Sequence, residues 1–302
     1  MKIFILFLIT ITCVSFIGCS SQEEDKKVDL QEIKDNRDGL DYKTTAHSQE
    51  DDLLMHIDSL LQKWQQAQRK QDHAVAMHTE KELEEISRGH FSFLIKSLNS
   101  DKSSIAAMAL GFSSDIRAIP SLEDSLQHGN VMTRCNAAMA LGHIGSDNVT
   151  MDVLTKILAQ EDEDEDVRAM VAFAIAQCTR HDKDFGSLST LHKVLSDRSS
   201  LVKNNAIIAL RKIGKKESGK NILATTINDE HPIVRYNSLL ALLNVSDWDT
   251  AKIAIVKRMR DPMEDVAHTA FQVATILSGK KYGEDVAKWE EYVNMAEAEQ
   301  EK

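Results

Sequence analysis

The residues best suited to chemistry are the six consecutive carboxylates from Glu161 to Asp166. A cluster of acidic oxygens can bind a hard cation such as Ca²⁺. A calcium loop of the EF-hand type, however, needs a glycine at its sixth position and a glutamate at its twelfth. Here the run passes directly into Val167 and Arg168. We therefore interpret it as a solvated turn whose acids favour a helix N-terminus, and we expect no metal site.

Other catalytic groups are scattered along the chain. The 11 histidines stand singly, and the sequence has neither a glycine-rich phosphate loop nor a paired-cysteine zinc motif. Cys135 and Cys178 fall in separate helical patterns, and a disulfide between them cannot be assigned from sequence; two buried or half-buried thiols are the alternative. We predict no catalytic residues, no cofactor and a non-enzymatic protein.

The composition favours helices over strands. Only 12 glycines and 3 prolines occur in 302 residues, and alanine, leucine, glutamate and lysine are plentiful. The formal net charge is -11, and no basic cluster lies on the repeats described below. Because nucleic acid binding depends on lysine and arginine replacing phosphate counterions, we expect no nucleic acid partner. The sequence therefore predicts an all-α protein with a neutral or basic partner.

An internal repeat dominates the middle of the chain. The hexapeptide Ala106–Gly111 recurs unchanged as Ala137–Gly142. The same register continues through Ala174-Ile175, Ala209-Leu210, Ala241-Leu242 and, more weakly, Val273-Ala274. The two identical copies begin 31 residues apart. Repeats of about this length are typical of stacked helical hairpins, in which each unit buries its apolar face only against its neighbours.

Charged residues recur in the same register. Valine followed by a basic residue precedes three of the copies, and an aspartate stands at a constant distance ahead of each pair. The aspartates are Asp162, Asp197 and Asp229, and the basic residues are Arg168, Lys203 and Arg235. Arg134 and Asp261 extend the two series. His128 replaces the acid of the second repeat, Ala267 replaces the base of the sixth, and the first repeat lacks the Val-Arg pair.

This pattern resembles the HEAT family, in the bacterial form related to phycobilisome lyases. The resemblance covers about residues 99–279 and implies an α-solenoid of about six helical hairpins. In that family the aspartate and arginine side chains form a ladder between consecutive repeats. The resemblance therefore assigns Asp162, Asp197, Asp229, Arg168, Lys203 and Arg235 to a structural ladder, which we expect to fray at both ends.

The second helix of each repeat has two apolar faces. In the fourth repeat, Val202, Ala206, Ala209, Leu210 and Ile213 share one face, which we predict to be core. The fifth residue after the basic position points almost the opposite way, yet it is apolar in five successive repeats. This stripe consists of Met108, Met139, Phe173, Ile208 and Leu240.

The stripe has two interpretations. It could be an apolar track on a concave surface that binds an amphipathic helix or an extended peptide. It could also pack sideways between neighbouring second helices, which lie about 10 Å apart. If the track exists, its polar rim would consist of His143, Arg211, Lys212, Tyr236 and His268.

The N-terminus has the features of an export signal. Lys2 precedes an apolar run from Ile3 to Ile17 that is short for a membrane span. The run ends in Gly18-Cys19, which resembles the lipobox of bacterial lipoproteins, an ordinary signal peptide or an uncleaved anchor being the alternatives. We predict a signal peptide at 1–18 and lipidation of Cys19. Residues 19–52 are strongly charged and poor in aromatic groups, so we expect a disordered tether.

Two flanking segments complete the predicted domains. Helical apolar spacing in 53–98 predicts N-terminal capping helices, followed by repeats at 99–279. Residues 280–302 contain Tyr282 and Trp289, and the segment resembles the closing cap of many bacterial HEAT proteins. We expect both aromatic side chains to be packed there, with an aromatic ligand patch as the alternative.

The sequence names no partner. The resemblance implies a membrane-anchored, extracytoplasmic scaffold in the cell envelope that binds a protein or peptide through its concave face. The outer membrane is favoured if the cell has one, because serines follow Cys19 where aspartate would resemble a retention signal. The alternative is an envelope enzyme or an accessory subunit, related to the lyase-like HEAT proteins, whose site a partner completes.

Overall fold

The structure is a computed structural model that describes residues 49–179 and 186–300. All regular elements within these ranges are helices, in agreement with the predicted all-α class. Two compact units divide the chain between Leu83 and Glu84. Each unit is described below by itself.

The first unit consists of α2 (Gln49–Arg69) and most of α3 (His73–Gly89). Ile57, Trp64 and Leu83 are its most enclosed side chains. His56 Nε2 lies 3.9 Å from Glu82 Oε1 and links the two helices. Both helices fall mainly within the segment 53–98, whose capping role stays a prediction. The signal peptide, Cys19 and nearly all of the tether lie outside the described residues.

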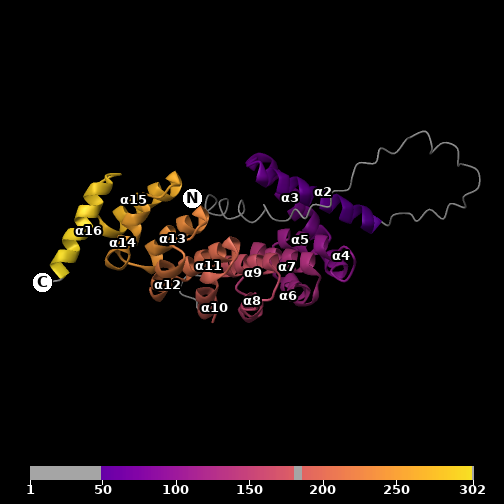
Figure 1. Cartoon of the computed structure of the whole chain (residues 1–302). Coiled ribbons are helices and arrows are strands. Elements are labelled where there is room, and N and C mark those ends of the chain that lie inside the picture. The colour runs from indigo at the N-terminus through magenta and orange to yellow at the C-terminus, as the bar shows by residue number, and fades with distance from the viewer. Residues whose placement is uncertain (1–48, 180–185, 301–302) are drawn as a thin grey trace, which may run out of the picture. The chain divides into compact units, whose positions relative to one another are not determined.

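The second unit is a stack of helical hairpins (Figure 1). The first helices of the hairpins are α4 (Phe91–Ser97), α6 (Ile119–His128), α8 (Met151–Leu158), α10 (Leu188–Lys193), α12 (Glu217–Thr225) and α14 (Trp248–Arg258). The second helices are α5 (Ser103–Phe112), α7 (Val131–Ile144), α9 (Glu165–Cys178), α11 (Ser200–Ile213), α13 (Pro232–Val245) and α15 (Glu264–Ser278). Short 3₁₀ helices, η2 (Ile116–Ala118) and η3 (Val194–Ser196), flank α6 and α10, and α16 (Val286–Gln300) closes the unit.

Each first helix packs against the second helix that follows it, and consecutive second helices pack against one another. Figure 1 shows the two sets along opposite sides of the stack. The first hairpin contains α4, so the stack begins ahead of the predicted start at residue 99. We use the term second-helix face for the side of the second helices that points away from the first helices.

Local sequence determines where the second helices begin and end. The side chain of Asn130 accepts a hydrogen bond from the Thr133 amide and caps α7, and Asp164 caps α9 in the same way. Gly145 and Gly214 end α7 and α11 with φ of 57° and 72°, a left-handed conformation that glycine adopts without steric cost. These signals fix the lengths of the helices that carry the ladder and the stripe.

The core lies between the two layers of helices. Val202, Ala206, Ala209, Leu210 and Ile213, the predicted core face of α11, are all buried at 0% exposure, so that prediction is confirmed. Small residues bring adjacent second helices close together. A side chain at Gly111 would place its Cβ 2.7 Å from the Ala140 Cα, a distance that real structures do not tolerate.

Candidate functional site

An ion-pair ladder runs along the turns that connect the hairpins. Arg134 pairs with Glu163, Arg168 with Asp197, Lys203 with Asp229 and Arg235 with Asp261. In every pair the base comes from one repeat and the acid from the next. Exposure of these side chains is 18% or less, so the pairs are largely shielded from solvent. The ladder bonds consecutive repeats, as the resemblance implied.

One predicted ladder residue is wrong. Asp162 is exposed, and its neighbour Glu163 makes the bond to Arg134, with Nη1 and Oε1 2.9 Å apart. Glu163 lies five residues ahead of Arg168, whereas Asp229 lies six residues ahead of Arg235. Connection length does not account for this shift, because residues 159–164 and 226–231 form connections of equal length.

Ladder acids are held in their ionised form. Burial alone would raise the pKa of Asp261, but hydrogen bonds from the Arg235 guanidinium and the Met263 amide outweigh it and lower the pKa. The pKa of Asp229 is lowered in the same way, by Lys203 and the His231 amide against the effect of burial. Arg258 also reaches Asp261 at 3.0 Å, a partner that the repeat register did not predict.

The ladder extends further than predicted at its C-terminal end. Arg260 donates to Glu290 of α16 at 3.0 Å and so joins the last hairpin to the closing helix. Both side chains are exposed, at 64% and 44%, so this pair contributes less than the shielded ones.

The acidic run serves the same connections. Glu161 pairs with Lys193 at 2.9 Å, Glu163 pairs with Arg134, and Asp164 caps α9. No cluster of three or more histidine, cysteine or acidic side chains that could hold a metal exists within 49–179 and 186–300. Members of the run therefore form ion pairs between neighbouring repeats and cap α9.

The stripe is packed, in contrast to an exposed binding track. Met108, Met139, Phe173 and Ile208 are only 2 to 4% exposed, and Leu240 alone is half-buried. The Phe173 ring fills the space beside Gly142 of α7, where an added Cβ would lie 2.6 Å from Phe173 Cε1. The track interpretation used only the angular position of each residue on its own helix. That position does not take account of the neighbouring second helices, which cover side chains that point sideways. The four buried side chains thus support the packing interpretation.

The proposed polar rim divides in two. His143 lies between Phe112 and Phe173, with ring centroids 5.3 and 6.2 Å away, and burial lowers the pKa of its imidazole to about 4. Lys212 bonds to the Ala176 carbonyl. Both groups are half-buried and bound to neighbouring helices. They act as packing residues on the N-terminal and central part of the second-helix face.

The C-terminal part of the second-helix face is more accessible. Tyr236 and Leu240 of α13 are half-buried, and His268 and Ile276 of α15 are exposed, Ile276 at 64%. A shallow pocket of about 390 Å³ lies on α15, lined by Phe271, Gln272, Thr275 and the two exposed residues together with Gly283 and Glu284. His268 Nδ1 lies 2.7 Å from Glu284 Oε1 at its edge. This surface combines apolar and hydrogen-bonding groups.

Arg211 of α11 borders the same surface. Burial lowers the pKa of its guanidinium, and the nearby Tyr236 partly offsets this effect. The sequence singled out Arg211, Tyr236, Leu240 and His268, and the structure places them on α11, α13 and α15. Ile276 was not predicted, although its apolar side chain in the last, unpaired second helix is a signal that could have found it.

The closing segment is packed as expected. Trp289 and Tyr292 pack against Trp248, and the rings of Tyr282 and Trp289 meet edge to face at 5.0 Å. Trp289 is fully buried and donates to the Gly283 carbonyl at 3.0 Å. The cluster closes the last hairpin, with both tryptophans buried and both tyrosines half-buried.

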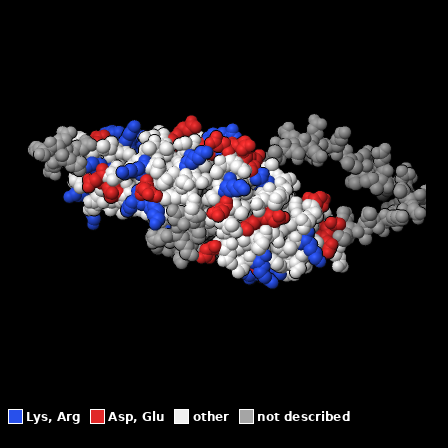
Figure 2. All heavy atoms as spheres, turned by 90° about the horizontal axis from the view of Figure 1, so that it is seen from below, with Lys and Arg blue, Asp and Glu red and all other residues white. Residues whose placement is uncertain are grey.

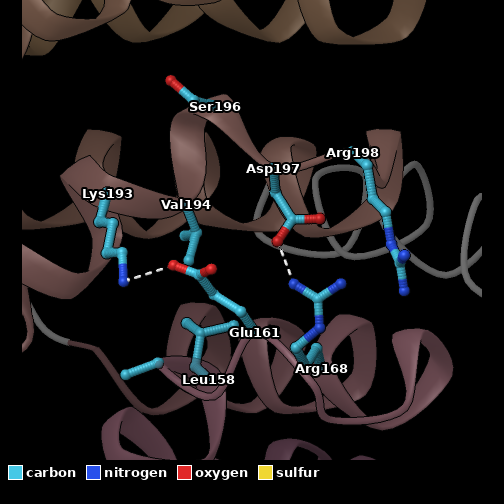
Figure 3. A pocket seen from close by; sticks show the side chains of 9 residues that line it. Leu158, Glu161, Arg168, Lys193, Val194, Ser196, Asp197 and Arg198 are labelled. Carbon is cyan, nitrogen blue, oxygen red and sulfur yellow. Dashed lines mark hydrogen bonds and ion pairs between the residues drawn. The ribbon is translucent and has the colours of Figure 1, made fainter.

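A second pocket, of about 580 Å³, lies at the ladder between the third and fourth hairpins (Figure 3). Leu158 and Val194 form apolar walls, and Arg168, Lys193 and Arg198 bring three positive charges. Glu161 and Asp197 are its acids, each drawn with its basic partner in Figure 3. The pocket was not predicted, because it depends on how the residues of two neighbouring hairpins lie against one another in space.

The face of the molecule drawn in Figure 2 carries acidic and basic side chains intermixed, with no broad basic area among its described residues. Cys135 and Cys178 are buried, reduced thiols, and burial raises the pKa of Cys135 to about 12. None of the helices within the described ranges is both long and apolar enough to cross a membrane.

A family model for HEAT repeats matches residues 90–176 and 151–242, which together cover half of the chain. The chain belongs to the HEAT-repeat family. An engineered protein has a similar fold at 20% identity and a TM-score of 0.50, with 66% of this HEAT chain and 97% of that protein covered. A second engineered protein gives the same identity and TM-score, with 74% and 68% covered.

An archaeal HEAT-like repeats protein from Thermococcus onnurineus NA1 is 19% identical to this HEAT chain, with 66% of this chain and 84% of that protein covered and a TM-score of 0.43. The search of curated proteins gave no match. The family and the fold are therefore established, and the ladder is the HEAT feature that the geometry shows most directly.

Proposed function

We propose that this HEAT protein is a non-catalytic scaffold, lipid-anchored at Cys19 in the cell envelope and outside the cytoplasm, that binds a protein partner. Stacked repeats suit this role because they present an extended surface on a rigid frame. The contact surface is the accessible part of the second-helix face over α13 and α15. The outer membrane is the favoured location if the cell has one.

The observation that carries this proposal is the exposure of Ile276, at 64%, beside the pocket formed by Phe271 and His268. A large exposed apolar side chain next to hydrogen-bonding groups is typical of interface centres. Elsewhere on the second-helix face the stripe residues are covered by their neighbours. A partner that uses this face would therefore contact its C-terminal part.

Matched isoleucines test the proposal. Ile276 on α15 and Ile253 on α14 are 64% and 60% exposed, one on a second helix and one on a first helix. A photo-crosslinking residue is placed at each position, and intact envelopes are irradiated. We expect a discrete protein adduct from position 276, and its loss in Leu240→Asp. Equal adducts from both positions, or none from 276, would contradict the proposed surface.

Aspartate substitutions provide the affinity measurement. Ile276→Asp should weaken binding of the captured partner by about tenfold or more, since a charge in an apolar contact must be desolvated. Ile253→Asp should leave affinity unchanged. Circular dichroism checks that both variants fold. A folded Ile276→Asp variant that retains full affinity would rule out this surface.

A further inference from the structure

Three ladder arginines occupy equivalent positions, and one differs in its bonds. Arg235 uses Nε and Nη2 on Asp261 and donates Nη1 to the carbonyls of Asp229 and Glu230. Arg134 uses Nη1 and Nη2 on Glu163 and donates Nε to the Leu126 carbonyl. Each of these guanidiniums therefore bonds both to the next repeat and to the backbone of its own repeat.

Among the described residues, Arg168 bonds only to the next repeat. Its Nη1 donates to Asp197, whereas its buried Nε has no hydrogen-bond partner among the described residues. The residue is 3% exposed, so the guanidinium has spare donors in a site largely closed to bulk water. Leu158, Ala159 and Glu161 of the same repeat line the 580 Å³ pocket beside this guanidinium.

Connection length does not explain this difference, because residues 159–164 before Arg168 and residues 226–231 before Arg235 form connections of equal length. Among the described residues, no backbone carbonyl accepts a hydrogen bond from Arg168, and a gap lies beside its guanidinium. The gap lies between apolar walls and beneath two mobile cationic side chains, since Lys193 and Arg198 are 60% and 73% exposed. Three cations and two carboxylates line the pocket, and Arg198 Nε also lies 3.9 Å from Glu165 Oε2 at its edge.

We propose that this pocket binds a carboxylate that has an aliphatic group next to it. The carboxylate would accept hydrogen bonds from Arg168 and Arg198, and the aliphatic group would lie against Leu158 and Val194. Lys193 would leave its exposed ion pair with Glu161 and bind the incoming anion instead. That exposed pair contributes little to stability. The source is either the free C-terminus of a protein partner or an acidic side chain.

The site is separate from the second-helix face, so it does not rest on the function proposed above. Small probes distinguish the two sources of carboxylate. N-acetylleucine carries a terminal carboxylate beside an aliphatic group, and N-acetylglutamic acid α-amide carries a side-chain carboxylate. N-acetylleucinamide and N-acetylglutamine amide are their neutral counterparts. Binding to the full chain in detergent is measured by saturation-transfer difference NMR at constant ionic strength.

We expect at least one carboxylate probe to bind about tenfold more tightly than its amide, as the loss of one charge-assisted hydrogen bond implies. The probe that binds identifies the source. Arg198→Ala and Lys193→Ala should each abolish this preference without unfolding the chain, because both side chains are largely exposed. Lys220→Ala, an exposed lysine on α12, should preserve it. Equal affinity for acid and amide, or a preference that survives both pocket variants, would overturn the proposal.

Discussion

Asp261 is the most enclosed acid of the ladder, with a side-chain exposure of 0% and bonds to both Arg235 and Arg258. Asp261→Asn keeps the shape but leaves two arginines without their anion. We expect a loss of about 3 kcal/mol in the free energy of unfolding, as for other broken buried pairs, measured by urea denaturation. Asp124→Asn, at a carboxylate that is 72% exposed and whose partner His128 is also 72% exposed, is the matched control and should change stability little.

The same residue predicts a dependence on pH. The pKa of Asp261 and the pKa of Asp229 are lower in the folded chain than in the unfolded chain. Their stabilisation is therefore complete above the unfolded pKa of about 4 and is lost as the pH falls through the folded values. Stability of the wild type should decline in acid more steeply than that of Asp261→Asn. Parallel pH profiles would show that these carboxylates do not stabilise the ladder.

Residue types and spacing predicted much of the ladder. A constant spacing of six residues ahead of the basic position located Asp197, Asp229 and Asp261. Asp162 has the same spacing but is exposed, and Glu163, one residue nearer to Arg168, pairs with Arg134 instead. Two further features depend on three-dimensional distances that residue spacing does not encode. The Arg168 Nε has no hydrogen-bond partner among the described residues, and Arg258 forms an ion pair with Asp261.

At the scale of elements, adjacent second helices are held by two kinds of close contact. An added Cβ at Gly142 meets the flexible ring of Phe173, at 2.6 Å, whereas one at Gly111 meets the backbone Cα of Ala140, at 2.7 Å. Gly142→Ala and Gly111→Ala should each lower the free energy of unfolding by about 1 to 3 kcal/mol, because the added methyl group overpacks the contact. Thermal unfolding of the purified variants measures both losses.

Second-site changes separate the two contacts. Phe173→Leu should recover much of the stability of Gly142→Ala, because it removes the ring atoms that clash. Ala140→Gly should fail to rescue Gly111→Ala, because the Cα remains in place. Rescue of both variants, or of neither, would show that this packing account of the second helices is incorrect.

Helical periodicity predicts the hairpins and the core but not the burial of the stripe. The core positions of α11 could be predicted from the periodicity of that helix alone, and they are fully buried. The stripe required knowledge of the gap between helices, which Gly111 and Gly142 make narrow. The AAMALG repeat contained that signal, because its glycines mark where the next helix approaches.

For the whole molecule, the predicted attachment to a membrane depends on lipidation of Cys19, which lies outside the described residues. We expect the wild type to sediment with membranes and to incorporate a radiolabelled fatty acid. Cys19→Ala should lose the label and accumulate as the uncleaved precursor, because lipidation precedes cleavage in lipoproteins with a lipobox. Cys135→Ala, at a buried thiol, is the control and should keep the label. A labelled Cys19→Ala chain would disprove the predicted lipidation site.

The forward pairing of the ladder makes the repeats interchangeable units. A repeat offers a base to its successor and an acid to its predecessor, so removing one whole unit brings together two groups of the same kinds that were paired before. Without the unit that contains Asp229 and Arg235, for example, Lys203 would face Asp261. Gain or loss of entire units therefore leaves every shielded charge matched, and such a chain can change its length in evolution without redesign of its joints.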